Sequence, residues 1–121
     1  MTKRIMTVED STSLREMITF TLGEAGYEVA EAEDGRDALD KLHGFKADLV
    51  ITDLNMPNMN GIELTRALRA NSSYRFVPII FLTTESQMQK KQSAKEAGAT
   101  GWIVKPFKPD QLLQVVRKVL G

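Results

Sequence analysis

The sequence contains no cysteine and only one histidine, His43. Without cysteine the chain has no disulfide, no thiolate metal site and no cysteine nucleophile. The lone histidine lies in the polar stretch HGFK, where we expect it to be solvated. A histidine-based zinc site and a Ser/His/Asp triad are therefore excluded as well.

The chain also lacks an excess of charge of either sign, because sixteen basic and sixteen acidic residues cancel. We therefore expect no direct nucleic-acid binding and no membrane insertion. The N-terminal stretch MTKRIMTVED has too short an apolar run for a signal peptide or a membrane span, so the expected compartment is the cytoplasm. With 121 residues, 42% of them hydrophobic, the chain is expected to form a single domain over residues 1–121.

Apolar runs of strand length alternate with segments of helical period. The predicted strands are residues 5–8, 27–32, 49–52, 77–82 and 101–105. The predicted helices cover about residues 13–25, 35–44, 61–70, 86–97 and 109–120. Ser13 and Glu16 stand in capping-box register at the start of the first helix. This alternation predicts an α/β fold, a flavodoxin-like doubly wound parallel sheet of five strands with five helices, in strand order 2-1-3-4-5.

Polar side chains follow the carboxyl ends of the predicted strands, where such sheets bind ligands. Glu9 and Asp10 follow the first strand, and Asp53 follows the apolar run of the third. Thr83 follows the fourth, and Lys105 ends the fifth. We therefore expect three acids, a hydroxyl and an amine to meet at one edge of the sheet.

Three crowded carboxylates need a counter-charge. At about 5 Å and an effective dielectric of about 20, each pair repels by roughly 3 kcal/mol, more than one lysine offsets. An all-oxygen cluster with room for water and a phosphoryl group suits Mg²⁺. The set therefore favours phosphoryl transfer onto Asp53, with Mg²⁺ held by Glu9, Asp10 and Asp53.

Three further residues complete this hypothesis. The Lys105 ammonium and the Thr83 hydroxyl would each bind a phosphoryl oxygen, and the backbone carbonyl of Asn55 would add a metal ligand. The competing interpretation is that Asp53 only opens a turn, but the polar residues at the other strand ends would then be coincidental.

Four stretches in this order resemble the receiver domain of two-component response regulators: VEDS (8–11), DLVITDLNMPNMNG (48–61), PIIFLTTES (78–86) and AGATGWIVKPF (97–107). Within that family the chain is most similar to the single-domain CheY-type chemotaxis regulators. The resemblance implies that Asp53 accepts a phosphoryl group from a sensor histidine kinase, or from a small phosphodonor, with Mg²⁺ required. It also implies self-catalysed hydrolysis of the acyl phosphate and a cis peptide bond between Lys105 and Pro106.

Two positions depart from the commonest family pattern. Glu9 stands where receivers usually have Asp, which leaves the metal geometry open. Trp102 stands where receivers have Tyr, Phe or His, an aromatic residue that swings inward when the threonine moves toward the phosphoryl group. Trp102 is therefore either a switch or simply part of the packing or of a partner surface. Asn55 and Glu85 resemble the residues of chemotaxis regulators that tune access of the attacking water.

The core is complete by Leu120, so we expect no effector domain and a protein that signals by binding. The expected partners are the kinase, a downstream target such as the flagellar motor switch, and a phosphatase. The fourth helix has a thin apolar face, so we expect it to shift at low cost when phosphorylation draws Thr83 inward. The predicted partner surface surrounds Lys91, Lys95, Trp102, Lys105 and Lys108.

Three other functions remain open. The first is a receiver, excised or stand-alone, from a non-chemotaxis phosphorelay or a transcriptional regulator. The second is an aspartate-nucleophile phosphatase of the haloacid dehalogenase type, which needs a second Asp where this chain has Asn55. The third is a flavodoxin-like electron carrier, but the stretch EDSTS opens with two acids that would repel a flavin phosphate.

Overall fold

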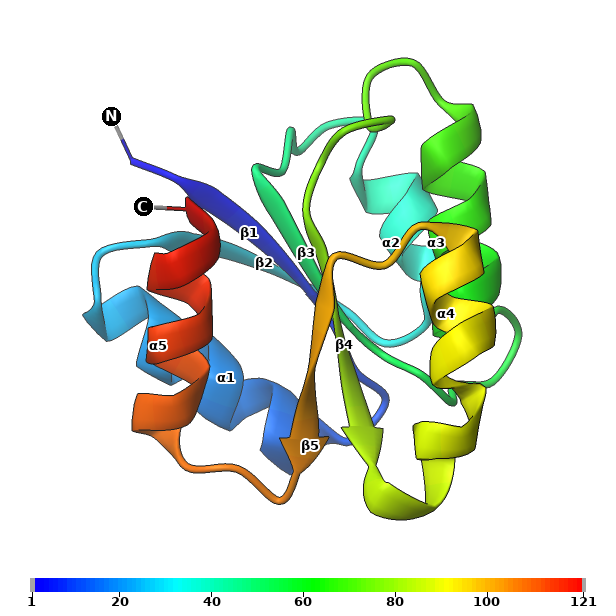
Figure 1. Cartoon of the computed structure of the whole chain (residues 1–121). Helices are drawn as coiled ribbons and strands as arrows, with labels where there is room; N and C mark the ends of the chain where they lie inside the picture. Colours follow the sequence, from blue (N-terminus) through cyan, green and yellow to red (C-terminus); the bar gives the residue numbers. More distant parts are fainter. Residues whose placement is uncertain (1, 121) are drawn as a thin grey trace.

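The computed structural model describes residues 2–120, without the side chains of Glu85 and Met88. Its sheet has five strands, and all neighbouring strands are parallel, in the order β2-β1-β3-β4-β5 (Figure 1). The strands are β1 (Arg4–Val8), β2 (Glu28–Ala32), β3 (Leu49–Asp53), β4 (Ile79–Thr84) and β5 (Gly101–Lys105). The predicted fold class and strand order are confirmed.

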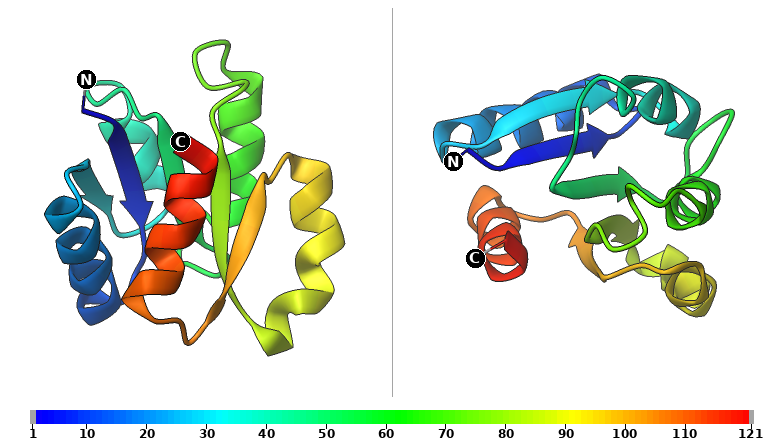
Figure 2. Two further views of the ribbon diagram at one scale, coloured as in Figure 1. Left: turned by 60° about the vertical axis from the view of Figure 1, so that its left-hand side comes forward. Right: turned by 90° about the horizontal axis from the view of Figure 1, so that it is seen from above.

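Helices cover both faces of this sheet, as Figure 2 shows from two further directions. One face carries α1 (Thr12–Glu24) and α5 (Pro109–Leu120), and the other carries α2 (Gly35–Lys41), α3 (Gly61–Ala70) and α4 (Lys91–Ala97). Alternate residues of β1 and β3 point to opposite faces, so Ile5 and Ile51 enter one core cluster while Met6 and Val50 enter the other. None of the described helices is long and apolar enough to cross a membrane.

The helix caps differ from the sequence prediction at α1. The N-cap is Ser11, whose hydroxyl accepts a hydrogen bond from the Leu14 N–H at 3.4 Å, so the prediction of Ser13 and Glu16 was wrong. The helix starts earlier because the chain turns directly after β1, and Ser11 is the first hydroxyl able to reach the free N–H groups. The capping box lies instead at α3, between Asn60 and Glu63.

The predicted fourth helix is divided into two segments. A 3₁₀ segment, η1 (Glu85–Lys90), precedes the seven-residue α4, which has no side-chain N-cap hydrogen bond and whose buried residues are Ala94 and Ala97. The Gln87 side chain accepts from the Thr84 N–H at 2.9 Å, which stabilises the tighter turn after β4. α2 is also shorter than predicted, since Leu42 caps it before Gly44.

Gly61 allows α3 to begin against the end of β3. Its N–H donates to the Leu54 carbonyl at 3.0 Å, and a Cβ at this position would overlap the carbonyl oxygen of Asp53. The close approach therefore requires glycine. It places the start of α3 directly behind the last residue of β3.

Candidate functional site

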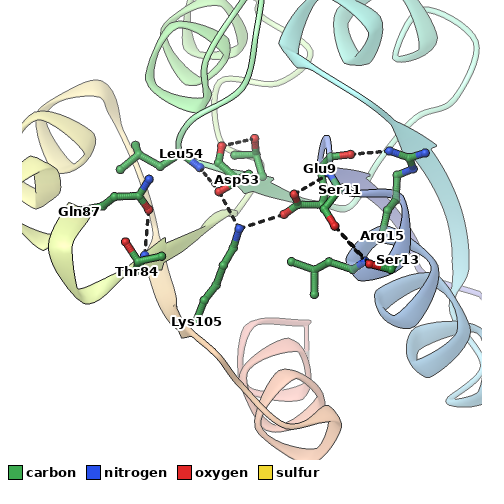
Figure 3. A network of polar contacts seen from close by, with 11 residues as sticks. Glu9, Ser11, Ser13, Arg15, Asp53, Leu54, Thr84, Gln87 and Lys105 are labelled. Carbon is green, nitrogen blue, oxygen red and sulfur yellow. Dashed lines mark hydrogen bonds and ion pairs between the residues drawn. The ribbon is translucent and has the colours of Figure 1, made fainter.

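Three acids from the ends of two strands form an acidic cluster at the carboxyl edge of the sheet. Glu9 and Asp10 follow β1, and Asp53 is the last residue of β3. One carboxylate oxygen from each lies within 4.8 Å of the others. Lys105, the last residue of β5, reaches the same place, and Figure 3 shows its amine between Glu9 and Asp53.

Asp53 is held firmly in this cluster. Its side chain is 7% exposed, and its Oδ1 atom accepts the Leu54 N–H at 2.9 Å. The same oxygen lies 3.1 Å from the Lys105 amine. The Leu54 N–H group also bonds the Leu82 carbonyl at 3.2 Å, which continues the ladder between β3 and β4 past the carboxylate. The backbone and side chain of Asp53 therefore both have fixed partners.

Glu9 is the most deeply buried acid of the cluster. Its Oε2 accepts the Ser11 N–H at 3.0 Å and its Oε1 accepts a hydrogen bond from Lys105 at 3.2 Å. Burial raises the pKa of Glu9 to about 7, and the charge on Asp53 adds to this, although the Ser11 and Lys105 bonds oppose it. Burial, the largest cause, therefore makes the charged form of Glu9 less stable here than in water.

Lys105 bridges two of the three acids. Burial by itself lowers the pKa of this amine, but the charges and hydrogen bonds of Asp53 and Glu9 outweigh burial and raise it, so the amine stays protonated. One ammonium then faces three carboxylates. A hard divalent cation fits this donor set, because carboxylate oxygens are its preferred ligands and the remaining negative charge matches it.

The structure places Thr83 and Trp102 beside one another but not in an open pocket. Thr83 is buried near the end of β4, and Trp102 is half-buried on β5. Both line a cavity of about 10 Å³, which holds at most about one water molecule. On Trp102, the Lys91 amine lies 4.4 Å from the ring centroid. The cavity is therefore too small to accept the indole unless the surrounding residues move.

The other predicted residues with described side chains lie outside the acidic cluster. Asn55 is exposed, and its Oδ1 accepts a hydrogen bond of 3.4 Å from Lys90. The side chain of Glu85, the other predicted tuning residue, is outside the described side chains. Lys95 and Lys108 are exposed on α4 and just before α5, and they do not join the acidic cluster. The Lys105–Pro106 peptide bond is cis.

Sequence reasoning missed Arg15, which supports the cluster, and Asp34, which supports the loop after β3. The Arg15 Nη1 atom donates to the backbone carbonyl of Glu9 at 2.6 Å (Figure 3). The Arg15 Nε atom lies 3.1 Å from the Glu31 carboxylate. No motif could have revealed Arg15, because its partner at the site is a main-chain oxygen. The loop beyond β3 is supported similarly by Asp34, whose carboxylate accepts from the Asp37 N–H and the Asn58 amide, both at 2.8 Å.

The structure thus combines a doubly wound sheet with an acidic cluster and a lysine at its carboxyl edge. The model of the response regulator receiver domain matches residues 5–117. The chain belongs to the receiver domain family of response regulators, and within it to the CheY type.

Two relatives match nearly the whole chain. The chemotaxis protein CheY1 of Helicobacter pylori is 42% identical in an alignment of 121 positions that covers 98% of this chain and 97% of the relative. The solved structure of the chemotaxis response regulator CheY4 of Vibrio cholerae is 48% identical, has a TM-score of 0.94, and is matched over 99% of this chain and 100% of its own.

A third relative contains a metal. The receiver domain of a sensor histidine kinase from Pseudomonas aeruginosa was solved with a magnesium ion coordinated in its active-site cleft. It is 28% identical, has a TM-score of 0.89, and is matched over 98% of each chain.

Proposed function

We propose that this protein is a phosphorylation-dependent signalling switch that accepts a phosphoryl group on Asp53. The observation that carries the proposal is the bridging position of Lys105, 3.1 Å from Asp53 and 3.2 Å from Glu9, beside a third carboxylate. A structural ion pair needs one acid and one base. An amine that bridges two acids, with a third acid beside them, instead suits a site that receives a cation and an anionic group together.

The acids Glu9, Asp10 and Asp53 fit a magnesium ion, and the Asn55 backbone carbonyl is a further candidate ligand. When bound, the ion neutralises charge on the phosphoryl oxygens. The presence of magnesium in the Pseudomonas aeruginosa receiver supports this assignment.

The remaining chemistry belongs to side chains of this chain. An oxygen of the ionised Asp53 carboxylate bonds to phosphorus as the bond from phosphorus to the donor's leaving atom breaks, and that atom keeps the electron pair. The donor is a phosphohistidine of a sensor kinase or a small acyl phosphate. The Lys105 amine and the Thr83 hydroxyl donate hydrogen bonds to the transferred group. Water later attacks phosphorus, the bond between phosphorus and the Asp53 oxygen breaks, and inorganic phosphate leaves as the carboxylate is restored.

The output we propose is a change in binding partner. The surface around α4, β5 and the start of α5 includes Lys91, Lys95, Trp102 and Lys108, and α4 is anchored through small buried residues. The similarity to two chemotaxis proteins supports a cytoplasmic role in chemotaxis, with the flagellar motor switch as target and a phosphatase that shortens the signal.

Incubation with Mg²⁺ and acetyl phosphate tests the chemistry. We expect an added phosphoryl mass on the peptide that contains Asp53, and none when Mg²⁺ is chelated. Label on another peptide would contradict the assignment. Binding of the purified motor switch protein, compared with and without acetyl phosphate, tests the output, and equal affinity in both conditions would argue against chemotaxis.

A further inference from the structure

Asp10 differs from the other two acids of the cluster in how it is held. It is exposed, and within residues 2–120 no ion pair or side-chain hydrogen bond holds its carboxylate. Glu9 and Asp53, in contrast, are each bound to Lys105 and to a backbone N–H. The direction of the Asp10 side chain is therefore set by the backbone that carries it.

Arg15 fixes that backbone. Its Nη1 donates to the Glu9 carbonyl at 2.6 Å, which is a charge-assisted hydrogen bond (Figure 3). The Glu9 N–H is also held, because it donates to the Ala32 carbonyl at 3.0 Å. The Glu9 carbonyl and the Cα of Asp10 belong to one planar peptide unit. Holding the carbonyl therefore also holds the point from which the Asp10 side chain leaves.

Glu31 orients the guanidinium for this task. Its Oε1 lies 3.1 Å from the Arg15 Nε, and the Arg15 side chain is only 17% exposed. A planar guanidinium bonds two partners in fixed directions, here a carboxylate on β2 and a carbonyl after β1. A lysine ammonium lacks this geometry.

We infer that Arg15 is a positioning residue for magnesium uptake, which it serves by holding the peptide between Glu9 and Asp10. The inference rests on the proposed magnesium-dependent function. Positioning and charge predict opposite effects of removing Arg15, because removal of a positive charge near the cluster should by itself strengthen cation binding. Weaker binding after removal of Arg15 would therefore identify positioning as the cause.

Calorimetric titration of MgCl₂ into the unphosphorylated protein tests the inference. We expect Arg15→Ala to weaken magnesium binding by about tenfold, the usual effect of losing a residue that orients a ligand. Arg15→Lys keeps the charge but loses the planar guanidinium that bonds two partners, so we expect magnesium binding to weaken by an intermediate factor of about three. Arg15→Lys also carries the test if Arg15→Ala does not fold.

The matched control is Arg4→Ala. Arg4 pairs with Glu28 at 3.3 Å across the same two strands, but at their opposite end. We expect the magnesium affinity of Arg4→Ala to stay within about twofold of that of the unsubstituted protein, because an exposed ion pair contributes little. An equal loss in Arg4→Ala would show a general effect on the fold and overturn the inference.

Two further outcomes separate the inference from the proposed function. If the original protein takes up no magnesium, the proposed function fails and the inference fails with it. If the original binds magnesium and both Arg15 variants bind equally well or more tightly, the inference alone is overturned. At saturating Mg²⁺, positioning also predicts that phosphorylation of Asp53 by acetyl phosphate returns to near the original rate.

Discussion

An aspartate stands at each end of β3, and the two have different surroundings. Asp48, just before the strand, accepts the backbone N–H of Arg4 at 2.8 Å. Asp53, the last residue of the strand, lies 3.1 Å from Lys105 and shares its surroundings with two other acids. The same residue type is thus a structural bridge at one end and part of a charged cluster at the other.

The difference follows from the parallel arrangement of the strands. At the amino end charged groups are paired one to one, as in the Arg4–Glu28 pair at 3.3 Å, whose side chains are 34% and 53% exposed. Such pairs are worth under about 1 kcal/mol. At the carboxyl end Glu9 and Asp53 are close and buried, and the charge on Asp53 adds to the raised pKa of Glu9. Reactivity is therefore expected at only one end.

The largest expected difference is between the two aspartates of β3. Asp53→Asn should abolish phosphorylation by acetyl phosphate, a loss of about a thousandfold or more, because an amide is not a nucleophile of this kind. Asp48→Asn keeps an oxygen for the Arg4 N–H and should label at the original rate. Mass spectrometry of both variants, with circular dichroism to confirm folding, measures the effect. Full labelling of Asp53→Asn would refute its role.

The next effect is a pH dependence of the unfolding free energy that arises from the Glu9 carboxyl group. Its pKa of about 7 in the folded state lies above the ordinary value of 4.5, so folding takes up a proton between these values. The stabilisation is present below about pH 4.5 and is lost as the pH rises through about 7. With chelator present, the unfolding free energy should fall by roughly 3 kcal/mol more in the original than in Glu9→Gln over this range.

Urea unfolding at a series of pH values measures this dependence. Glu28→Gln serves as the control from the amino end, where the exposed pair with Arg4 contributes little. A Glu9→Gln profile parallel to that of the original would show that burial of Glu9 creates no such linkage.

A smaller effect is expected from the bridging amine. Lys105→Ala removes the positive group that bridges Glu9 and Asp53, so magnesium binding should tighten by about tenfold while phosphotransfer slows. Lys46→Ala, at the other end of the sheet, should change neither. Calorimetry and labelling rates report the two effects separately. Weaker magnesium binding in Lys105→Ala would show that the amine holds the acids in place more than it competes with the ion.

The smallest expected effect concerns two cation–π pairs. Lys91 lies 4.4 Å from the Trp102 ring centroid, and Lys46 lies 5.8 Å from that of Tyr74. Each is worth about 0.5–1 kcal/mol at an exposed site. Because Trp102 shares a cavity with Thr83, its fluorescence should respond to phosphorylation, and Lys91→Ala should alter that response. Lys46→Ala should not, and identical traces for all three proteins would exclude a role for Lys91.

The sequence predicted most of the fold because β-branched runs and helical periods alternate without interruption. β5, α3 and α5 have the predicted bounds. β4 starts at Ile79 rather than residue 77, since Pro78 has no N–H to donate to a neighbouring strand. The break between η1 and α4 could not be predicted, because a weakly apolar helical pattern is equally compatible with a 3₁₀ turn.

The convergence of the acids with Lys105 could be predicted because the carboxyl ends of parallel strands meet at one edge of the sheet, whatever the conformation of the loops. The roles of these residues stay predictions. The role of Arg15 could not be predicted, because a hydrogen bond to a main-chain oxygen requires no particular residue type in the sequence of its partner. The tight space at Trp102 was also hidden, since it depends on how Lys91 and its neighbours pack around the ring.

The bare backbone at Gly61 has a consequence for attempts to redesign the protein. Because even a methyl group there would collide with the main chain of Asp53, the first turn of α3 packs directly against that residue. Engineering that alters reactivity should therefore work from the solvent side, whereas substitutions behind the strand would displace the acid itself.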